Sequence, residues 1–283
     1  MDGLVFEQVS HRPPPPLDRY VEKCVGYRMA GYEPGVHAGL PSRWLTFVIA
    51  LDEPLDLSVL PDPRLPATRF DSAIGGLHTS PVTIRHQGDQ HGVQLSVTPL
   101  GARALFGRPA SDLASIVVEL EDLLGADGCE LIDRVRAGST WTERFAAVES
   151  ILGRRVAFDA AVRPEIGYAW RQLQASGGAV SIQDLARDTG WSRRHLTAQF
   201  RAEYGLGPKA MARVLRFERS RDRLTTAKPA DRSLAAIAAD CGYADQAHLS
   251  REWRALAGAS PTAWLAQEEL PFVQDEPVPV GTR

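Results

Sequence analysis

Arginine is the residue type with the most informative distribution in this chain, because it makes one long segment basic. Residues 160–266 hold 14 Arg and two Lys against ten Asp and Glu, a net charge of +6, whereas residues 1–159 carry −6 and residues 267–283 carry −3. The overall charge of −3 therefore hides a basic segment between two acidic ones. A guanidinium fork suits phosphate oxygens or a guanine edge better than an ammonium group does. The segment indicates contact with polyanions, although a general codon bias toward Arg is an alternative, since the first half is Arg-rich too.

The other reactive residue types show no spacing typical of catalysis. The chain has no nucleophile elbow, no phosphate-binding glycine loop and no paired metal motif. Its three cysteines, Cys24, Cys129 and Cys241, are far apart, which argues against a disulfide framework and against a cysteine zinc site. No apolar run approaches the ~20 residues of a membrane span, and residues 1–4 lack the start of a secretion signal. We expect a cytoplasmic chain that is not an enzyme, has no membrane partner and uses no metal or cofactor.

The basic segment contains an internal repeat. Leu185-Ala186, Gly190, Leu196 and Phe200 in one copy match Ile237-Ala238, Gly242, Leu249 and Trp253 in the other. The offset is 52 residues before the glycine and 53 after it, because the second copy has one extra residue there. In each copy the glycine allows the left-handed turn that ends one helix, and the two large apolar residues, one turn apart, fix the next helix onto it.

Capping residues mark where these helices begin. Ser181 with Asp184 predicts a capping box for the first helix of copy one, and Ser233 predicts an N-cap in copy two. Together the markers predict two helix-turn-helix units. A helical-hairpin array is the structural alternative, but such arrays usually need at least three units.

A further helix is predicted between the two units, over Pro208–Leu224. As a straight helix of about 17 residues it spans roughly 25 Å. With the widths of the flanking units added, the second helices of the units could lie about one DNA turn apart, ~34 Å. One chain could then enter two successive major grooves on one face of a duplex. A solvated basic face is expected for Arg216, Arg219, Arg221 and Arg223.

Residues 163–267 resemble the DNA-binding domain of AraC/XylS-type transcription regulators, the arabinose-operon regulator family. The resemblance is carried by residues 181–186, Gly190-Trp191-Ser192, Leu196, Phe200, Ile237-Ala238, residues 241–243, residues 248–251 and residues 258–261. Trp253 and Ala257 stand where the family often has phenylalanine, and Trp264 where it often has tyrosine, which implies a repacked end of the second unit. The resemblance implies a sequence-specific regulator whose partner is double-stranded DNA.

The resemblance places the base-reading positions on the second helix of each unit. They are Arg193, Arg194, Thr197 and Ala198 in copy one, and Gln246, Ala247, Ser250 and Arg251 in copy two. The positions in copy one also lie off the apolar face of Leu196 and Phe200, so we expect them to face solvent. Arginine suits guanine or phosphate, glutamine suits adenine, and threonine suits a thymine methyl group or a phosphate. Lys209 and Arg213 are phosphate candidates, and for His195 and His248 packing or phosphate contact is favoured over base reading.

The first half of the chain has a different pattern. Strands are expected at residues 44–51, 55–60, 74–78, 82–86 and 93–97. Helices are expected at residues 102–106, 111–124, 127–135 and 141–152, the last with an apolar stripe that faces either the strands or a second subunit. The fold class is therefore α+β: an antiparallel β-barrel or sandwich with helices over residues 1–157, an all-α region over 163–267, and a disordered tail over 268–283.

AraC-type regulators often carry an N-terminal sensor domain, and the order of elements here is similar. We therefore expect a small-molecule effector, with Arg43, Trp44, His37 and His78 as candidate ligands; the alternatives are structural or surface roles. RNA polymerase and a second copy of the chain are further candidate partners. The rival function is a cupin-like metal enzyme, or an alkyl-transfer DNA-repair protein, fused to the same DNA-binding module. Such repair proteins normally show a four-cysteine zinc cluster, which this sequence lacks.

Overall fold

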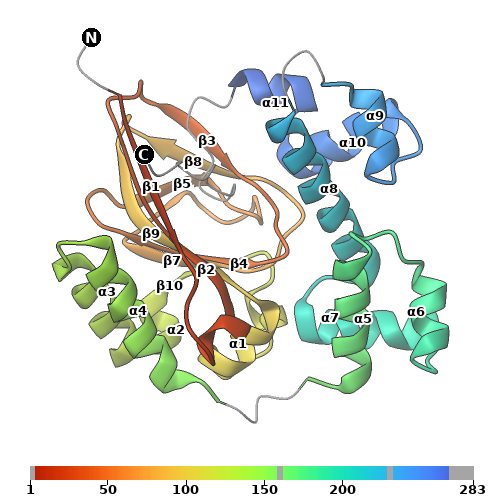
Figure 1. Cartoon of the computed structure of the whole chain (residues 1–283), viewed down its shortest axis with the longest axis horizontal. Helices are drawn as coiled ribbons and strands as arrows, with labels where there is room; N and C mark the ends of the chain where they lie inside the picture. Colours follow the sequence, from red (N-terminus) through yellow and green to blue (C-terminus); the bar gives the residue numbers. More distant parts are fainter. Residues whose placement is uncertain (1–3, 158–161, 228–231, 268–283) are drawn as a thin grey trace, which may run out of the picture.

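The computed structural model describes residues 4–157, 162–227 and 232–267. The described strands lie within the first 119 residues; the helices up to Arg155 lie below them in Figure 1, and the helices from Pro164 to Gln267 lie to their right. The strands are β1 Val5–His11, β2 Val21–Ala30, β3 Gly35–Gly39, β4 Leu45–Ala50, β5 Leu55–Val59, β6 Thr68–Phe70, β7 Ser72–Gly75, β8 Val82–His86, β9 Gln90–Val97 and β10 Val117–Glu119. The helices are α1 Pro99–Phe106, α2 Leu120–Leu124, α3 Ala126–Ala137, α4 Trp141–Arg155, α5 Pro164–Ala175, α6 Ile182–Asp188, α7 Arg193–Tyr204, α8 Pro208–Thr226, α9 Leu234–Asp240, α10 Gln246–Ala257 and α11 Pro261–Gln267, with short 3₁₀ turns η1 Leu17–Arg19 and η2 Ala110–Leu113.

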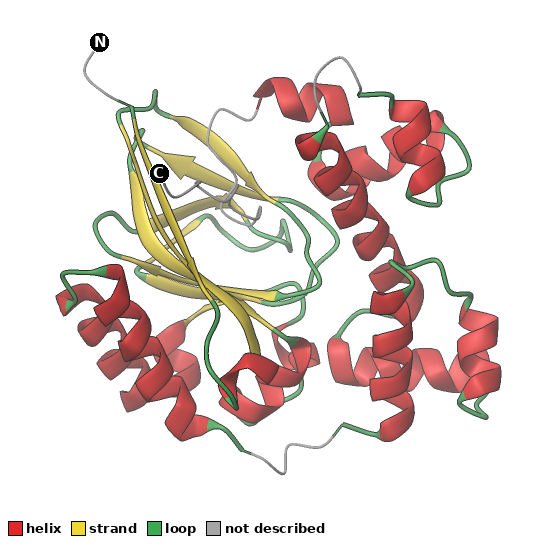
Figure 2. Ribbon diagram, viewed as in Figure 1, coloured by secondary structure: helices red, strands yellow, loops and turns green. Residues whose placement is uncertain are grey.

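Within the described residues the strands form two antiparallel sheets. One has the order β1-β2-β9-β4-β7-β10 and the other β3-β8-β5-β6. The centre of the larger sheet is buried on both faces, because the successive residues Val93, Gln94, Leu95 and Ser96 of β9, which alternate between the faces, are all buried. The sheets face each other without closing into a barrel, so the α+β class is confirmed and an open sandwich describes it best (Figure 2).

The expected helix over residues 111–124 is wrong. This stretch forms η2, then β10, and only then α2. Val117 and Val118 pair with Gly75 and Ile74 of β7, so the segment extends the edge of the larger sheet. Two adjacent β-branched residues fit a sheet edge well, and this tertiary pairing overrides the helical spacing of the flanking leucines.

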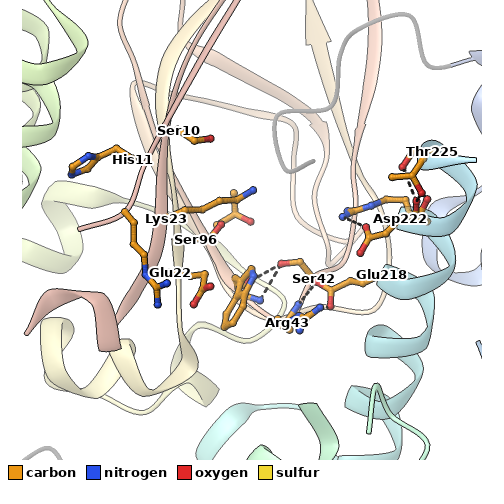
Figure 3. A pocket seen from close by; sticks show the side chains of 15 residues that line it. Ser10, His11, Glu22, Lys23, Ser42, Arg43, Ser96, Glu218, Asp222 and Thr225 are labelled. Atoms are coloured by element: carbon orange, nitrogen blue, oxygen red, sulfur yellow. Dashed lines mark hydrogen bonds and ion pairs between the residues drawn. The ribbon is translucent and has the colours of Figure 1, made fainter. Parts of the chain in front are cut away.

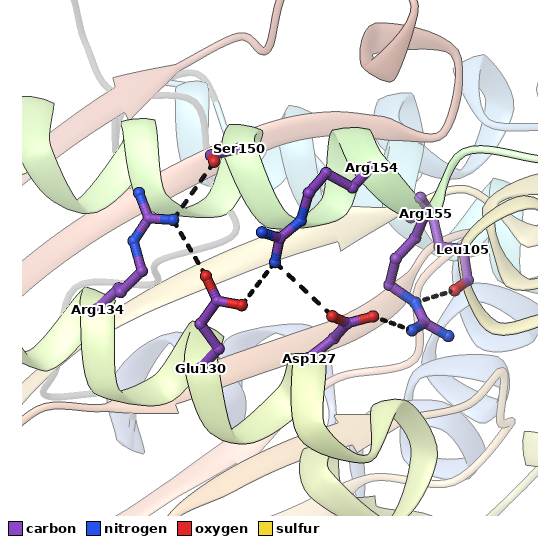
Figure 4. Close-up of polar contacts among 7 residues, drawn as sticks. All are labelled: Leu105, Asp127, Glu130, Arg134, Ser150, Arg154 and Arg155. Carbon is purple, nitrogen blue, oxygen red and sulfur yellow. Dashed lines mark hydrogen bonds and ion pairs between the residues drawn. The ribbon is translucent and has the colours of Figure 1, made fainter.

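The α3–α4 hairpin covers the larger sheet. The apolar stripe of α4 faces the strands rather than a second subunit, since Phe145 is buried and stacks on His11 of β1 at 5.0 Å between ring centroids. An ion-pair network joins the two helices on their outer side: Glu130 contacts Arg134 at 3.3 Å and Arg154 at 2.7 Å, and Asp127 contacts Arg155 (Figure 4). Such exposed pairs add little stability, and their effect is to align the helices.

The helices from α5 onward are arranged around α8. The side chains of Met211, Val214, Leu215 and Phe217 are buried, and the buried positions extend around most of α8 rather than along one side. The helix is two residues longer than predicted and ends at Thr226. Trp170 of α5 closes the first unit by packing on Tyr204 at 4.9 Å between ring centroids. The tail predicted to be disordered, residues 268–283, lies outside the described residues.

Candidate nucleic-acid interface

The first helix-turn-helix unit consists of α6, a glycine turn and α7. The Ser181 hydroxyl accepts from the Asp184 N–H at 3.0 Å, so Ser181 caps α6; the predicted capping box is not formed, because the Asp184 carboxylate accepts from the Ser181 hydroxyl at 2.6 Å instead of from its backbone N–H. Gly190 has a φ of +71°, and the Trp191 N–H then donates to the Ala186 carbonyl at 2.9 Å. The left-handed glycine therefore ends α6 and turns the chain into α7.

Helix α7 presents its predicted DNA-contacting residues to solvent. The Ser192 side chain caps the helix by accepting from the His195 N–H at 3.2 Å. Leu196 and Phe200 are fully buried. The residues on the other faces, Arg193, Arg194, Thr197 and Ala198, are exposed. His195 is also exposed and stands edge-on to Trp191, with 4.6 Å between ring centroids. The first turn of α7 is thus rigid, cationic and accessible.

The second unit repeats this construction in α9 and α10. The Ser233 side chain caps α9 through the Ala236 N–H, and Gly242 has a φ of +77°. The Asp245 carboxylate caps α10 by accepting from the His248 N–H at 2.6 Å. The extra residue of this copy lies between the glycine and the cap, so the longer offset is taken up in the turn.

Helix α10 also presents most of its predicted residues to solvent. Gln246, Ala247 and Arg251 are exposed, whereas Ser250 is half-buried. Lys209, in the first turn of α8, is exposed as well. All nine predicted DNA-contacting positions therefore lie on the two second helices or at the start of the helix between them.

The expected basic face of α8 is only partly present. Arg219 and Arg223 are exposed, but Arg216 is half-buried and donates to the Gly178 carbonyl at 2.8 Å, and Arg221 is buried. The prediction of solvated side chains is wrong for these two, because α8 is covered on several sides by α5, by the second unit and by the N-terminal region. Arg213 forms an ion pair with Glu252 of α10 at 2.6 Å.

The unusual tryptophans of the second unit do form a repacked end. Trp253 is fully buried and packs on Phe217 at 4.9 Å and on Trp264 at 5.4 Å between ring centroids. Its indole N–H donates to the Ser220 hydroxyl at 2.9 Å. This contact ties α10 and α11 to α8.

The four predicted effector residues are divided between two cavities. Arg43 and Trp44 line a cavity of about 970 Å³ between the N-terminal region and α8 (Figure 3). His37 and His78 line a cavity of about 100 Å³ between the two sheets. The His78 Nδ1 contacts the Ser80 carbonyl at 2.6 Å, and burial lowers the pKa of its ring.

The larger cavity contains an ion pair that sequence reasoning missed. Glu218 of α8 is almost fully buried and accepts from the backbone N–H of Arg43 at 2.9 Å and from its Nε at 2.8 Å. Burial raises the pKa of the Glu218 carboxyl, and the charge and hydrogen bonds of Arg43 oppose this shift. Lys23 and Arg221 line the same cavity. The partners are 175 residues apart in the chain, so no local pattern could have revealed them.

Over residues 4–157, 162–227 and 232–267, no three His, Cys, Asp or Glu side chains are grouped so that they could hold a metal ion. No helix in the same ranges combines the length and apolar character needed to cross a membrane.

Comparisons with known proteins agree with this architecture. The model of the family described as "Helix-turn-helix domain" matches residues 185–267. No curated protein matches the chain. ToxT from Vibrio cholerae is similar in structure, with 11% identity over 94% of this chain and 99% of that chain and a TM-score of 0.52.

Two other solved structures are also similar. Wild-type ToxT from Vibrio cholerae strain SCE256, bound to an unsaturated fatty acid, has 10% identity over 95% of this chain and 98% of that chain, with a TM-score of 0.50. A transcriptional regulator from Chromobacterium violaceum with an AraC-type DNA-binding domain has 27% identity over 38% of this chain and 96% of that chain, with a TM-score of 0.34. These comparisons agree with the predicted fold, a double helix-turn-helix region preceded by a β-rich region.

Proposed function

We propose that this AraC-type regulator binds duplex DNA through α7 and α10 together, and that an organic acid held between its two regions is its effector. As in the sequence-based prediction, residues 1–157 bind the effector and residues 163–267 bind DNA. The observation that carries the proposal is the pair of capped helices whose first turns are exposed and polar in both units. Recognition helices of this motif read base edges with their N-terminal residues.

Each exposed side chain has a role suited to its chemistry. Arg194 and Arg251 read guanine through two parallel hydrogen bonds, and Gln246 reads adenine. Thr197, Ala198 and Ala247 offer methyl groups to thymine. The phosphate contacts fall to Arg193, Ser250 and Lys209, which position the helices without reading sequence.

Binding should depend steeply on salt, because each cation that contacts a phosphate releases counterions. With the two cationic contacts of Arg193 and Lys209, affinity should fall about tenfold between 50 and 200 mM salt. The test is selection of duplexes from a random-sequence pool by the full chain, followed by titration of the selected duplex at both salt concentrations. Failure to enrich any sequence contradicts the proposed function, and enrichment with a salt slope near zero contradicts the phosphate contacts.

The effector site is the larger cavity. Its volume of about 970 Å³ matches the ~300–1,000 Å³ typical of ligand pockets, whereas the cavity beside His37 and His78 is too small. The larger cavity is lined by four cations, Arg12, Lys23, Arg43 and Arg221, and by three carboxylates, Glu22, Glu218 and Asp222. Arg43 pairs with Glu218 and Arg221 with Asp222, so Arg12 and Lys23 supply the positive excess, and Trp44 gives an apolar wall. A structurally similar protein, ToxT, has been solved with an unsaturated fatty acid. These features support an organic acid with an apolar tail.

Calorimetric titration of the full chain with oleate tests this assignment. We expect Lys23→Gln to weaken oleate binding about tenfold, the loss of one charge-assisted hydrogen bond. The methyl ester of oleate should bind the parent chain about tenfold more weakly than oleate does, since the ester lacks the negative charge. Lys209→Gln removes a lysine far from the cavity and should leave oleate binding unchanged. Equal binding of oleate and its ester would remove the role of the cations.

The remaining assignments complete the proposal. We propose that the chain acts by binding, without catalysis, in the cytoplasm where its duplex target lies. A second copy of the chain and RNA polymerase remain predicted partners.

A further inference from the structure

We propose that Arg103 and Arg43 are positioning residues for DNA recognition: the N-terminal region holds both helix-turn-helix units in the arrangement that binds two successive grooves. This inference rests on the proposed DNA-binding function. It assigns to the N-terminal region a mechanical role that needs no effector.

The first anchor holds the C-terminal end of α7. The Arg103 guanidinium of α1 donates to both carboxylate oxygens of Glu203, at 2.6 and 2.7 Å. The Ser111 hydroxyl donates to the Ala202 carbonyl at 2.7 Å. The backbone at Gly205, just after α7, approaches the segment after η2 so closely that a Cβ added to Gly205 would lie 2.2 Å from the Ala114 Cβ. A bidentate pair of this kind fixes orientation as well as distance.

The second anchor holds the middle of α8. Arg43 donates twice to Glu218, as described above, and the Glu218 side chain is only 5% exposed. The Glu203 side chain is 10% exposed. Removing either arginine would leave a nearly buried carboxylate without its cation, which strongly disfavours the docked arrangement.

A third contact lies at the C-terminal end of α10. A Cβ on Gly258, the residue that ends this helix, would lie 3.5 Å from the Pro81 side chain in the loop before β8. Both recognition helices therefore end beside the N-terminal region: α7 is bonded there to α1 and η2, whereas α10 ends close to Pro81.

Because the C-terminal ends of α7 and α10 face the N-terminal region, their first turns are directed away from it, and the predicted base-reading side chains there are exposed. Figure 2 shows helices α5–α7 and helices α9–α11 on the same side of the strands, with α8 between the two groups (labelled in Figure 1). When two binding units are held at a matching spacing, the second contact becomes intramolecular, and the whole chain binds more tightly than either unit alone.

The experiment compares two duplexes. One is the selected duplex with both half-sites, and the other has the half-site of the second unit scrambled. We expect Arg103→Ala to weaken binding to the first duplex about tenfold and to change binding to the second less than twofold. The exchange Arg103→Glu with Glu203→Arg should restore most of the lost affinity, because it rebuilds the pair in reverse.

Arg134→Ala is the control for loss of an arginine, since Arg134 forms an exposed ion pair with Glu130 on α3, away from the interface. It should change neither affinity. Equal losses on both duplexes would show that Arg103 supports only folding, and tighter binding by Arg103→Ala would show that docking inhibits DNA binding; either result overturns the inference. If Arg103→Ala binds both duplexes as tightly as the parent chain, Arg103 has no positioning role, and the proposed DNA-binding function still stands. If the parent chain selects no duplex, it is the proposed function that fails.

Discussion

Arg194→Ala is expected to weaken binding to the selected duplex by about 1–3 kcal/mol and to relax the preference at one base position. The reason is geometric. Ser192 fixes the first turn of α7, and the exposed side chain of Arg194 projects from this turn. In the proposed complex this turn lies in the major groove, next to the base edges. A guanidinium there can donate to both acceptors of one guanine. Arg251→Ala should have the same effect on a position read by α10.

The measurement is a set of dissociation constants for single-base variants of the selected duplex, for the parent chain and for each alanine variant. Arg201→Ala serves as the control, because this exposed arginine lies in the last turn of the same helix. Its loss should weaken all sequences little and equally. If Arg194→Ala instead weakens every duplex to the same extent, Arg194 contacts phosphate and the base assignment is wrong.

The largest effect on stability is expected for Trp253→Ala. Trp253 is fully buried, packs on Phe217 and Trp264, and donates to Ser220. Truncating a buried tryptophan creates a cavity and removes dispersion contacts, which costs about 3–5 kcal/mol. The free energy of unfolding should fall by this amount in urea denaturation followed by circular dichroism.

Two further variants make this prediction specific. Trp253→Phe keeps most of the volume and should cost less than Trp253→Ala, while the exposed neighbour Arg254→Ala should stay within about 0.5 kcal/mol of the parent chain. A loss below about 1 kcal/mol for Trp253→Ala would mean that the second unit is organised around other contacts.

Much of the DNA-binding region could be predicted because its determinants are local. Gly190 and Gly242 end helices since they adopt positive φ, and Ser192 and Asp245 cap the helices that follow. These interactions span at most a few residues, so they appear as spacing in the sequence. The register of buried leucines then decides which side chains are left for solvent.

Prediction failed where distant segments decide the outcome. The strand β10 exists because β7 offers an edge, and Arg221 is buried because α8 is covered by the rest of the molecule. The residue types in these segments indicated neither the strand β10 nor the burial of Arg221. The four effector candidates line two different cavities, and only the tertiary structure separated Arg43 and Trp44 from His37 and His78.

The sequence by itself thus determined the two helix-turn-helix units, their capping and the identity of their exposed side chains, because hydrogen bonds and turns between near neighbours decide these features. Only the tertiary structure decided how the units are held, through Arg103 with Glu203 and Arg43 with Glu218. These pairs join residues 100 and 175 positions apart. A charged side chain carries no local signal of its partner, because the pair forms only once burial has brought the two segments together.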